Sequence, residues 1–174
     1  MAVRSPAERY TLVVLGRSKV GKTAITIRYT SNVFDADSYD PTIEDKFLKH
    51  TNIAGAPALL EILDTSGDEV WRALRRMWMK VGDGESGLLF VFSLVDRKTF
   101  DELEAFREEL MDLYGDDPPP SVLVANKADA DRGEWSVSED EVTLLRTRWR
   151  NCGQVVYTSA RSDRNIVEAF EPLC

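Results

Sequence analysis

Five short apolar runs, separated by helical patterns, constrain the fold of this chain more than any other feature of its sequence. They lie at residues 10–15, 58–63, 88–95, 121–125 and 154–157. Each run is short and rich in β-branched or aromatic residues, which is typical of strands that are buried on both faces. Because helical patterns separate these runs, the sequence predicts an α/β fold in which helices wrap a parallel sheet.

Two helices are marked clearly in the sequence. Between residues 100 and 113, apolar residues recur every three or four positions across acidic ones, which predicts one amphipathic helix. Gly115 ends this helix, and the three prolines at 118–120 cannot continue it. Ser138, with Glu141 three residues later, forms a capping box that predicts the start of a further helix.

The composition fits one folded domain and excludes several classes of protein. With 174 residues, 43% hydrophobic and 30% charged, the chain is expected to form a single domain over residues 1–174. A net charge of -8 argues against nucleic acid as a partner, because phosphate backbones attract positive surfaces. The apolar run at 88–95 is far shorter than the roughly 18 residues of a membrane span. With only two cysteines, Cys152 and Cys174, we expect a reducing, cytoplasmic location.

A glycine-containing loop follows the first apolar run directly. Residues 16–23 read GRSKVGKT and fit the pattern G-x-x-x-x-G-K-[ST], and residues 23–32 read as a helix whose N-terminal amides face the loop. This context predicts a phosphate-binding loop, whereas an ordinary strand-to-helix turn is the alternative. Gly21 lets the backbone approach the phosphates, and Lys22 supplies positive charge. The expected contacts are Ser18, Lys19, Val20, Gly21, Lys22, Thr23 and Ala24.

Two oxygen-bearing side chains are candidate ligands of Mg²⁺. The hydroxyl of Thr23 follows the loop, and Asp64 follows the apolar run at 58–63. A parallel sheet presents ligand groups at the carboxyl ends of its strands, which is where Asp64 is expected to lie and where it can hold Mg²⁺ through water. Taken alone, an aspartate at the end of a strand is as typical of a turn.

Residues 64–69 read DTSGDE and resemble the DTAGQE segment of Ras-family GTPases. The run YDPTIED at 39–45 is the same as the first switch of the Ras subfamily, NKAD at 126–129 matches the guanine motif N-K-x-D, and TSA at 158–160 matches the third base-contacting segment. With the phosphate loop, five motifs stand in family order. The resemblance implies a three-layer P-loop NTPase G domain with a six-stranded, mostly parallel sheet, helices on both faces, and an antiparallel strand at about 45–53 beside residues 58–63.

The resemblance also implies how guanine is recognised. Asp129 offers two carboxylate oxygens to the N1–H and 2-amino group of guanine, a donor pair that adenine lacks, and this argues against a P-loop kinase or ATPase. Asn126 and Lys127 are expected to brace the phosphate loop and flank the ring. The backbone amide of Ala160, between Ser159 and Arg161, is placed to donate to the base carbonyl. Phe34 is expected against the guanine face, with a core aromatic as the alternative.

The resemblance implies that the two switches make contacts that depend on whether the γ-phosphate is present. By resemblance, Thr42 completes the Mg²⁺ shell formed with Thr23 and Asp64 only when GTP is bound, Tyr39 contacts the nucleotide, and the Gly67 amide donates to the γ-phosphate. Lys22, Thr42, Gly67 and Asp68 form the expected catalytic set. Residues 39–50 and the second switch are the expected surface for effector proteins, and an exchange factor and an activating protein are further expected partners.

The sequence departs from the family pattern at positions that affect GTP hydrolysis and membrane association. Asp68 replaces the water-orienting glutamine with a shorter, charged side chain, and Ser18 and Lys19 replace two glycines where an arginine finger would approach. We therefore predict slow hydrolysis. The alternative is a pseudo-GTPase binding module that stays GTP-loaded. The sequence ends at Cys174 after Pro172, without a C-a-a-X box, so membrane association is expected only if a lipidated tail is missing here.

Overall fold

The computed structural model describes residues 8–35, 44–80 and 85–174. Tyr39 and Thr42, both expected at the nucleotide, lie outside the described residues.

The described strands form one six-stranded sheet in the order β2-β3-β1-β4-β5-β6. Their bounds are Glu8–Leu15 (β1), Glu44–Ile53 (β2), Ala56–Thr65 (β3), Glu85–Ser93 (β4), Ser121–Asn126 (β5) and Cys152–Tyr157 (β6). Only the β2–β3 pair is antiparallel, and β2 lies at an edge of the sheet. The predicted sheet is therefore confirmed, including its antiparallel strand.

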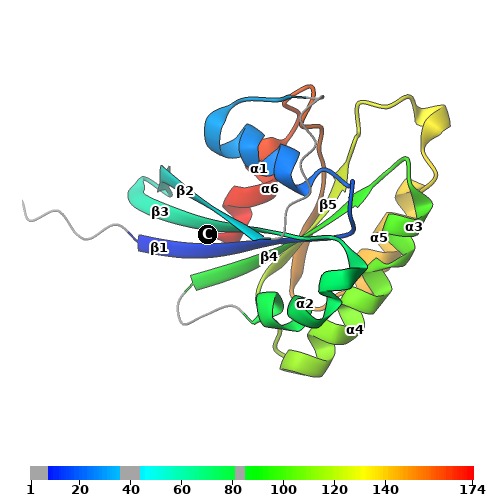
Figure 1. The fold of residues 1–174 in the computed structure, drawn as a ribbon, viewed down its shortest axis with the longest axis horizontal. Coiled ribbons are helices and arrows are strands. Elements are labelled where there is room, and N and C mark those ends of the chain that lie inside the picture. The colour runs from blue at the N-terminus through cyan, green and yellow to red at the C-terminus, as the bar shows by residue number, and fades with distance from the viewer. Residues whose placement is uncertain (1–7, 36–43, 81–84) are drawn as a thin grey trace, which may run out of the picture.

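Helices cover both faces of this sheet (Figure 1). α1 and α6 lie on one face, and α2, α3, α4 and α5 lie on the other. Their bounds are Lys22–Ser31 (α1), Arg72–Met79 (α2), Arg97–Asp101 (α3), Leu103–Tyr114 (α4), Glu139–Arg148 (α5) and Ile166–Phe170 (α6). Single 3₁₀ turns stand at Glu69–Trp71 (η1), Arg132–Glu134 (η2) and Glu171–Leu173 (η3).

Alternation along the strands divides the core into two clusters. Leu12 and Val14 of β1 face α1 and α6, whereas Val13 and Leu15 face α2, α4 and α5. Because side chains of a strand point to opposite faces in turn, a central strand that is apolar throughout feeds both clusters at once. This is the three-layer arrangement expected from the sequence, and it fixes the carboxyl ends of β1 and β3 at one edge.

The single amphipathic helix predicted over residues 100–113 is wrong in one detail, because it is two helices, α3 and α4. Asp96 caps α3 by accepting a hydrogen bond from the amide of Lys98. At Glu102 the amide is shared between the carbonyls of Lys98 and Phe100, and the Glu102 carbonyl accepts from the Ala105 amide. The bond from Ala105 spans three residues instead of four and tightens the backbone locally, although the Glu102 carbonyl also accepts from the Phe106 amide. The apolar spacing therefore continues across the point at which the helix is interrupted.

The capping box is confirmed. The Ser138 hydroxyl accepts from the Glu141 amide at 3.3 Å, and the Glu141 carboxylate accepts from the Ser138 amide at 2.9 Å. Both bonds satisfy donors that would otherwise be unpaired at the start of α5.

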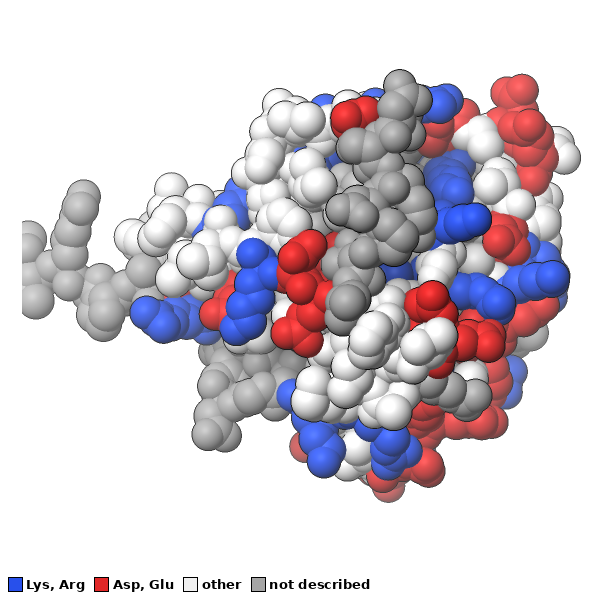
Figure 2. Space-filling model, viewed as in Figure 1, with Lys and Arg blue, Asp and Glu red and all other residues white. Residues whose placement is uncertain are grey.

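Among the described residues, no helix is both long enough and apolar enough to cross a lipid bilayer. On the face shown in Figure 2, acidic and basic side chains are interspersed. The excess of negative charge is therefore spread over this face and mixed with positive charge.

Candidate functional site

The loop between β1 and α1 is held in place by the end of β5. The side-chain amide of Asn126 donates to the Val20 carbonyl at 2.8 Å, and its oxygen accepts from the Thr158 hydroxyl at 3.1 Å. Gly21 adopts a φ of 97°, and a Cβ there would overlap the Asn126 amide. The position therefore requires glycine both for its backbone conformation and for this close approach.

Lys22 is the buried cation of the loop. Its ammonium donates to the carbonyl oxygens of Gly16 and Arg17, both at 2.9 Å, and the residue is 7% exposed. Burial lowers the pKa of this ammonium to about 8, although the charges of Asp64 and Glu102 oppose the shift. At neutral pH the group is still mostly protonated, so the loop holds a positive charge at its centre.

Thr23 and Asp64 meet below the loop. The Thr23 hydroxyl donates to Oδ2 of Asp64 at 2.5 Å, and Asp64 is fully buried. Burial raises the pKa of Asp64 to about 6, while the Thr23 bond and Lys22 partly counteract this. The second oxygen, Oδ1, is buried without a hydrogen-bond partner among the described residues. An unsatisfied carboxylate oxygen beside a hydroxyl is the oxygen donor set that Mg²⁺ uses, so these two residues fit that ion.

A cavity of about 1360 Å³ opens above this pair and extends from the phosphate loop to the end of β5. Of the predicted nucleotide and catalytic residues, the lining includes Ser18, Lys19, Gly21, Lys22, Thr23, Ala24, Phe34, Gly67, Asp68, Asn126, Lys127, Asp129, Ala160 and Arg161. Val20, Asp64 and Ser159 are buried behind this lining. Residues from five separate stretches of the sequence, at 18–24, 34, 67–68, 126–129 and 160–161, therefore surround one space.

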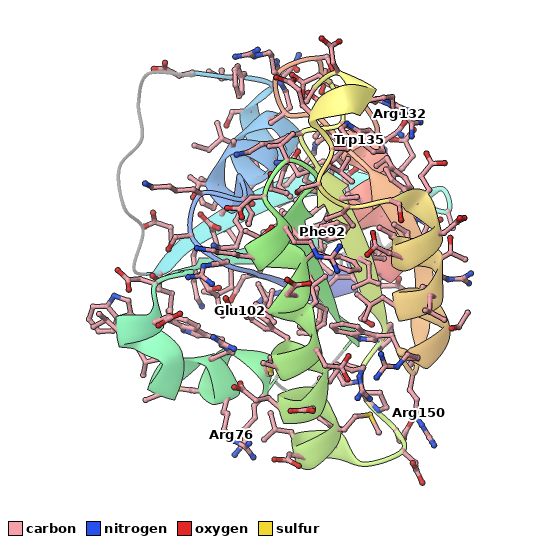
Figure 3. All side chains as sticks on the ribbon, turned by 90° about the vertical axis from the view of Figure 1, so that its right-hand side faces the viewer. Arg76, Phe92, Glu102, Arg132, Trp135 and Arg150 are labelled. Atoms are coloured by element: carbon pink, nitrogen blue, oxygen red, sulfur yellow. The ribbon has the colours of Figure 1, made fainter. Side chains whose placement is uncertain are left out.

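The far end of the cavity is built from two loops. Asp129 follows β5 and lies 3.9 Å from the guanidinium of Arg161, its neighbour on the second loop. Trp135 fixes the first loop, because its indole N–H donates to the Ala130 carbonyl at 3.1 Å. Arg132 lies 4.0 Å over the Trp135 ring, and Figure 3 shows both beside η2. No local pattern in the sequence marks this hydrogen bond, so the role of Trp135 is visible only in the structure.

The second switch lies against the phosphate loop. The Ser18 amide donates to the Gly67 carbonyl at 3.0 Å, and a Cβ on Gly67 would overlap the backbone of Arg17 and Ser18. Asp68 is exposed, and its carboxylate accepts from the Val70 amide at 3.1 Å. The carboxylate of Asp68 is therefore engaged in the turn that begins η1.

Charged side chains, of which Arg75 is buried, tie the phosphate loop to the second switch. Glu102, between α3 and α4, accepts from Arg17 at 2.9 Å and from Arg75 of α2 at 3.1 Å. Arg75 also lies 4.0 Å from the Phe106 ring and is 8% exposed. Figure 3 shows Glu102 at the start of α4. Arg76, a residue of α2, lies near the other end of α4. The sequence alone does not indicate these contacts, because Arg17 and Glu102 are 85 positions apart.

A second contact joins α2 to β2, whose first residues, Glu44 and Asp45, belong to the first switch. The indole N–H of Trp78 donates to the carboxylate of Glu44 at 2.6 Å, and Trp78 is 4% exposed. Glu44 is the first residue of β2. The start of β2 is therefore bonded to the helix of the second switch.

The comparison with known protein families agrees with this arrangement. A family model described as "Ras family" matches residues 11–174, which is almost the whole chain. The match includes the phosphate loop, both switches and the two loops at the far end of the cavity. The chain therefore belongs to the Ras family of GTP-binding, GTP-hydrolysing switches.

Proposed function

We propose that this protein is a guanine-nucleotide switch that binds GTP and GDP with Mg²⁺, hydrolyses GTP slowly and thereby controls effector binding. One observation carries the proposal: a single cavity has the buried ammonium of Lys22 at one end and the carboxylate of Asp129 at the other. A guanine nucleotide carries negative charge at its phosphates and a pair of N–H donors on its base. The ammonium of Lys22 matches the charge of the phosphates, and the carboxylate of Asp129 can accept hydrogen bonds from the two donors of the base.

At the phosphate end, Lys22 and the amides at the start of α1 bind the phosphate chain. The ammonium is already held over the loop by the carbonyls of Gly16 and Arg17. The helix begins at Lys22, so its first amides have no partner within the helix and donate outward. Anion binding at this position therefore needs little rearrangement.

Thr23 and Asp64 would hold Mg²⁺ in both nucleotide states, and Thr42 would join them in the GTP state. The ion, when bound, neutralises charge on the β- and γ-phosphates. The protein supplies the Thr23 hydroxyl and Oδ1 of Asp64, which has no hydrogen-bond partner within the described part of the chain. Burial of Asp64 favours its protonated form, and a neighbouring cation would favour the charged form instead.

Slow hydrolysis follows from the place and the chemistry of Asp68. Its carboxylate is exposed and bonded to the Val70 amide, so it is turned toward its own chain. A carboxylate that reached the γ-phosphate would add negative charge where phosphoryl transfer must stabilise it. The same observation favours the second candidate function, a nucleotide-dependent binding module whose hydrolysis is too slow to matter.

We propose that effectors bind to residues 39–50 and to the second switch. β2 is an edge strand whose outer side is free of any neighbouring strand among the described residues, and Leu48 is 63% exposed on it. Val70 of the second switch is 77% exposed. An open strand edge beside exposed apolar side chains is suited to a partner that adds a strand.

The test is to identify the nucleotide that copurifies with the protein and then to titrate the nucleotide-free protein calorimetrically with GDP, a non-hydrolysable GTP analogue and ATP. We expect a guanine nucleotide to copurify and ATP to bind far more weakly. Lys22→Ala should abolish tight binding, while Lys46→Ala, which removes an exposed lysine paired with Glu61, should not. Equal affinity for GTP and ATP would contradict the proposal.

A further inference from the structure

Arg28 of α1 donates hydrogen bonds to three backbone carbonyls that lie outside its own helix. Its guanidinium donates to the carbonyl of Ala160 at 2.8 Å, to that of Arg161 at 3.1 Å and to that of Asn32 at 3.3 Å. The side chain is 16% exposed. Three acceptors from two segments, 132 positions apart in the case of Ala160, converge on one planar group.

Both segments form walls of the cavity at the end where the base is expected. Ala160 and Arg161 line it directly. Asn32 ends α1 in a left-handed conformation with a φ of 55°, and the chain then continues to Phe34, another lining residue. The Arg28 guanidinium lies 5.8 Å from the centre of the Phe34 ring. One side chain thus joins the wall at Phe34 to the wall at Ala160.

The hydrogen bonds around Ala160 fix the direction of its amide. The Ser159 carbonyl accepts from the Arg164 amide at 3.0 Å, and the next carbonyl, that of Ala160, accepts from Arg28. In a trans peptide the C=O and the following N–H point in opposite directions, and no described peptide bond is cis. The Ala160 N–H therefore points away from Arg164, and it cannot rotate while both carbonyls are held.

We propose that Arg28 is a positioning residue for guanine recognition: it holds the loop at residues 160–161 so that the Ala160 amide meets the carbonyl oxygen of the base. This inference rests on the proposed function, in which that amide donates to the base. Arginine is suited to the task because its planar fork donates in several fixed directions, whereas lysine offers a compact charge on a flexible stem. Asp163 lies 3.9 Å from the guanidinium and is its one ion-pair partner among the described residues.

The test compares two diphosphates, GDP and 6-thio-GDP, on the nucleotide-free protein with Mg²⁺ present. Sulfur at position 6 is a weak hydrogen-bond acceptor, while the donors facing Asp129 remain. Arg28→Ala should raise the Kd for GDP about tenfold, which corresponds to one hydrogen bond, and the Kd for 6-thio-GDP by less than about threefold. Arg28→Lys should resemble Arg28→Ala.

Arg146→Ala is the matched control, because Arg146 also donates to a backbone carbonyl, that of Gly153 at 3.1 Å, but does not line the cavity. It should leave both affinities unchanged. Equal weakening of both nucleotides by Arg28→Ala would show a merely structural role, and no weakening of either, or full rescue by lysine, would also overturn the inference. If the unaltered protein binds both nucleotides equally, the base carbonyl is not recognised at all, which instead contradicts the proposed contact of Ala160.

Discussion

The hydroxyl of Thr23 donates to the carboxylate of Asp64 across 2.5 Å and so joins the first turn of α1 to the end of β3. We expect the same two residues to set the response of nucleotide release to Mg²⁺. For the unaltered protein, chelation of Mg²⁺ should speed GDP release strongly. In Thr23→Ala, release should already be fast and should respond little to chelation, because one of the two oxygens is gone.

Release of a fluorescent GDP analogue with and without EDTA measures this effect. Thr30→Ala is the matched control, since Thr30 lies on the same helix and donates to the carbonyl of Thr26. A Thr23→Ala protein that keeps the full response to EDTA would exclude Thr23 as a ligand.

Asp129 is expected to decide which base is bound. Asp129→Asn should lower the affinity for GDP at least about 100-fold, because two hydrogen bonds to a charged acceptor are lost. Affinity for xanthosine diphosphate should rise, since the amide can donate to the extra carbonyl of xanthine. Calorimetry with both nucleotides measures the change, and Asp131→Asn, another acidic residue of the cavity, should have little effect.

Replacing Asp68 should change the rate of hydrolysis. Asp68→Gln removes the negative charge and lengthens the side chain that now caps η1, so single-turnover hydrolysis should become about tenfold faster or more. Asp68→Asn, which removes the charge without adding length, separates the two effects. Slower hydrolysis in Asp68→Gln, or in Asp68→Ala at neutral pH, would instead support Asp68 as a working substitute for glutamine.

The charges around Glu102 should contribute to folding stability. Glu102→Ala leaves the buried Arg75 with one carboxylate partner fewer, and breaking a buried ion pair costs about 3 kcal/mol. The exposed pair of Arg76 and Asp112 provides the control, because Arg76→Ala should cost less than about 1 kcal/mol. Urea unfolding at a fixed nucleotide concentration measures both. Equal losses for the two variants would mean that Glu102 has no special role.

Stability should also depend on pH through the capping box of α5. Hydrogen bonds from the Ser138 amide, from Arg97 and from the Ser138 hydroxyl lower the pKa of Glu141 to about 2, from an ordinary 4.5. A carboxyl whose pKa is lower in the folded state stabilises the fold above the unfolded pKa. Its contribution is therefore complete above about pH 4.5 and is lost as the pH falls toward about 2.

The urea midpoints of the unaltered protein and of Glu141→Gln, followed from pH 7 downward, check this. The difference between them should be constant near neutral pH and should shrink below pH 4.5. A difference that does not change with pH would show that the charge of Glu141 contributes nothing.

The sequence by itself determined the sheet and the residues around the cavity. The apolar run at 10–15 lies in β1, Glu8–Leu15, and the run at 121–125 lies in β5, Ser121–Asn126. Both could be predicted because a strand that is buried on both faces has a local pattern of apolar residues. The residues of a short motif are likewise placed by the strand and the helix beside them. Gly21 and Lys22 are adjacent in the chain, so a strand and a helix on either side are enough to place both at the cavity.

Only the tertiary structure decided how the loops around that cavity are held. Arg28 bonds a carbonyl 132 positions away, and Arg17 bonds a carboxylate 85 positions away. The turn of Asp68 toward Val70 and the break between α3 and α4 at Glu102 also left no mark in the apolar spacing. The physical reason is that hydrogen bonds and ion pairs are directional and short, so they form only where the folded chain brings donor and acceptor together. A pattern of apolar residues, in contrast, indicates that these residues are buried, and it does so whichever residues they pack against.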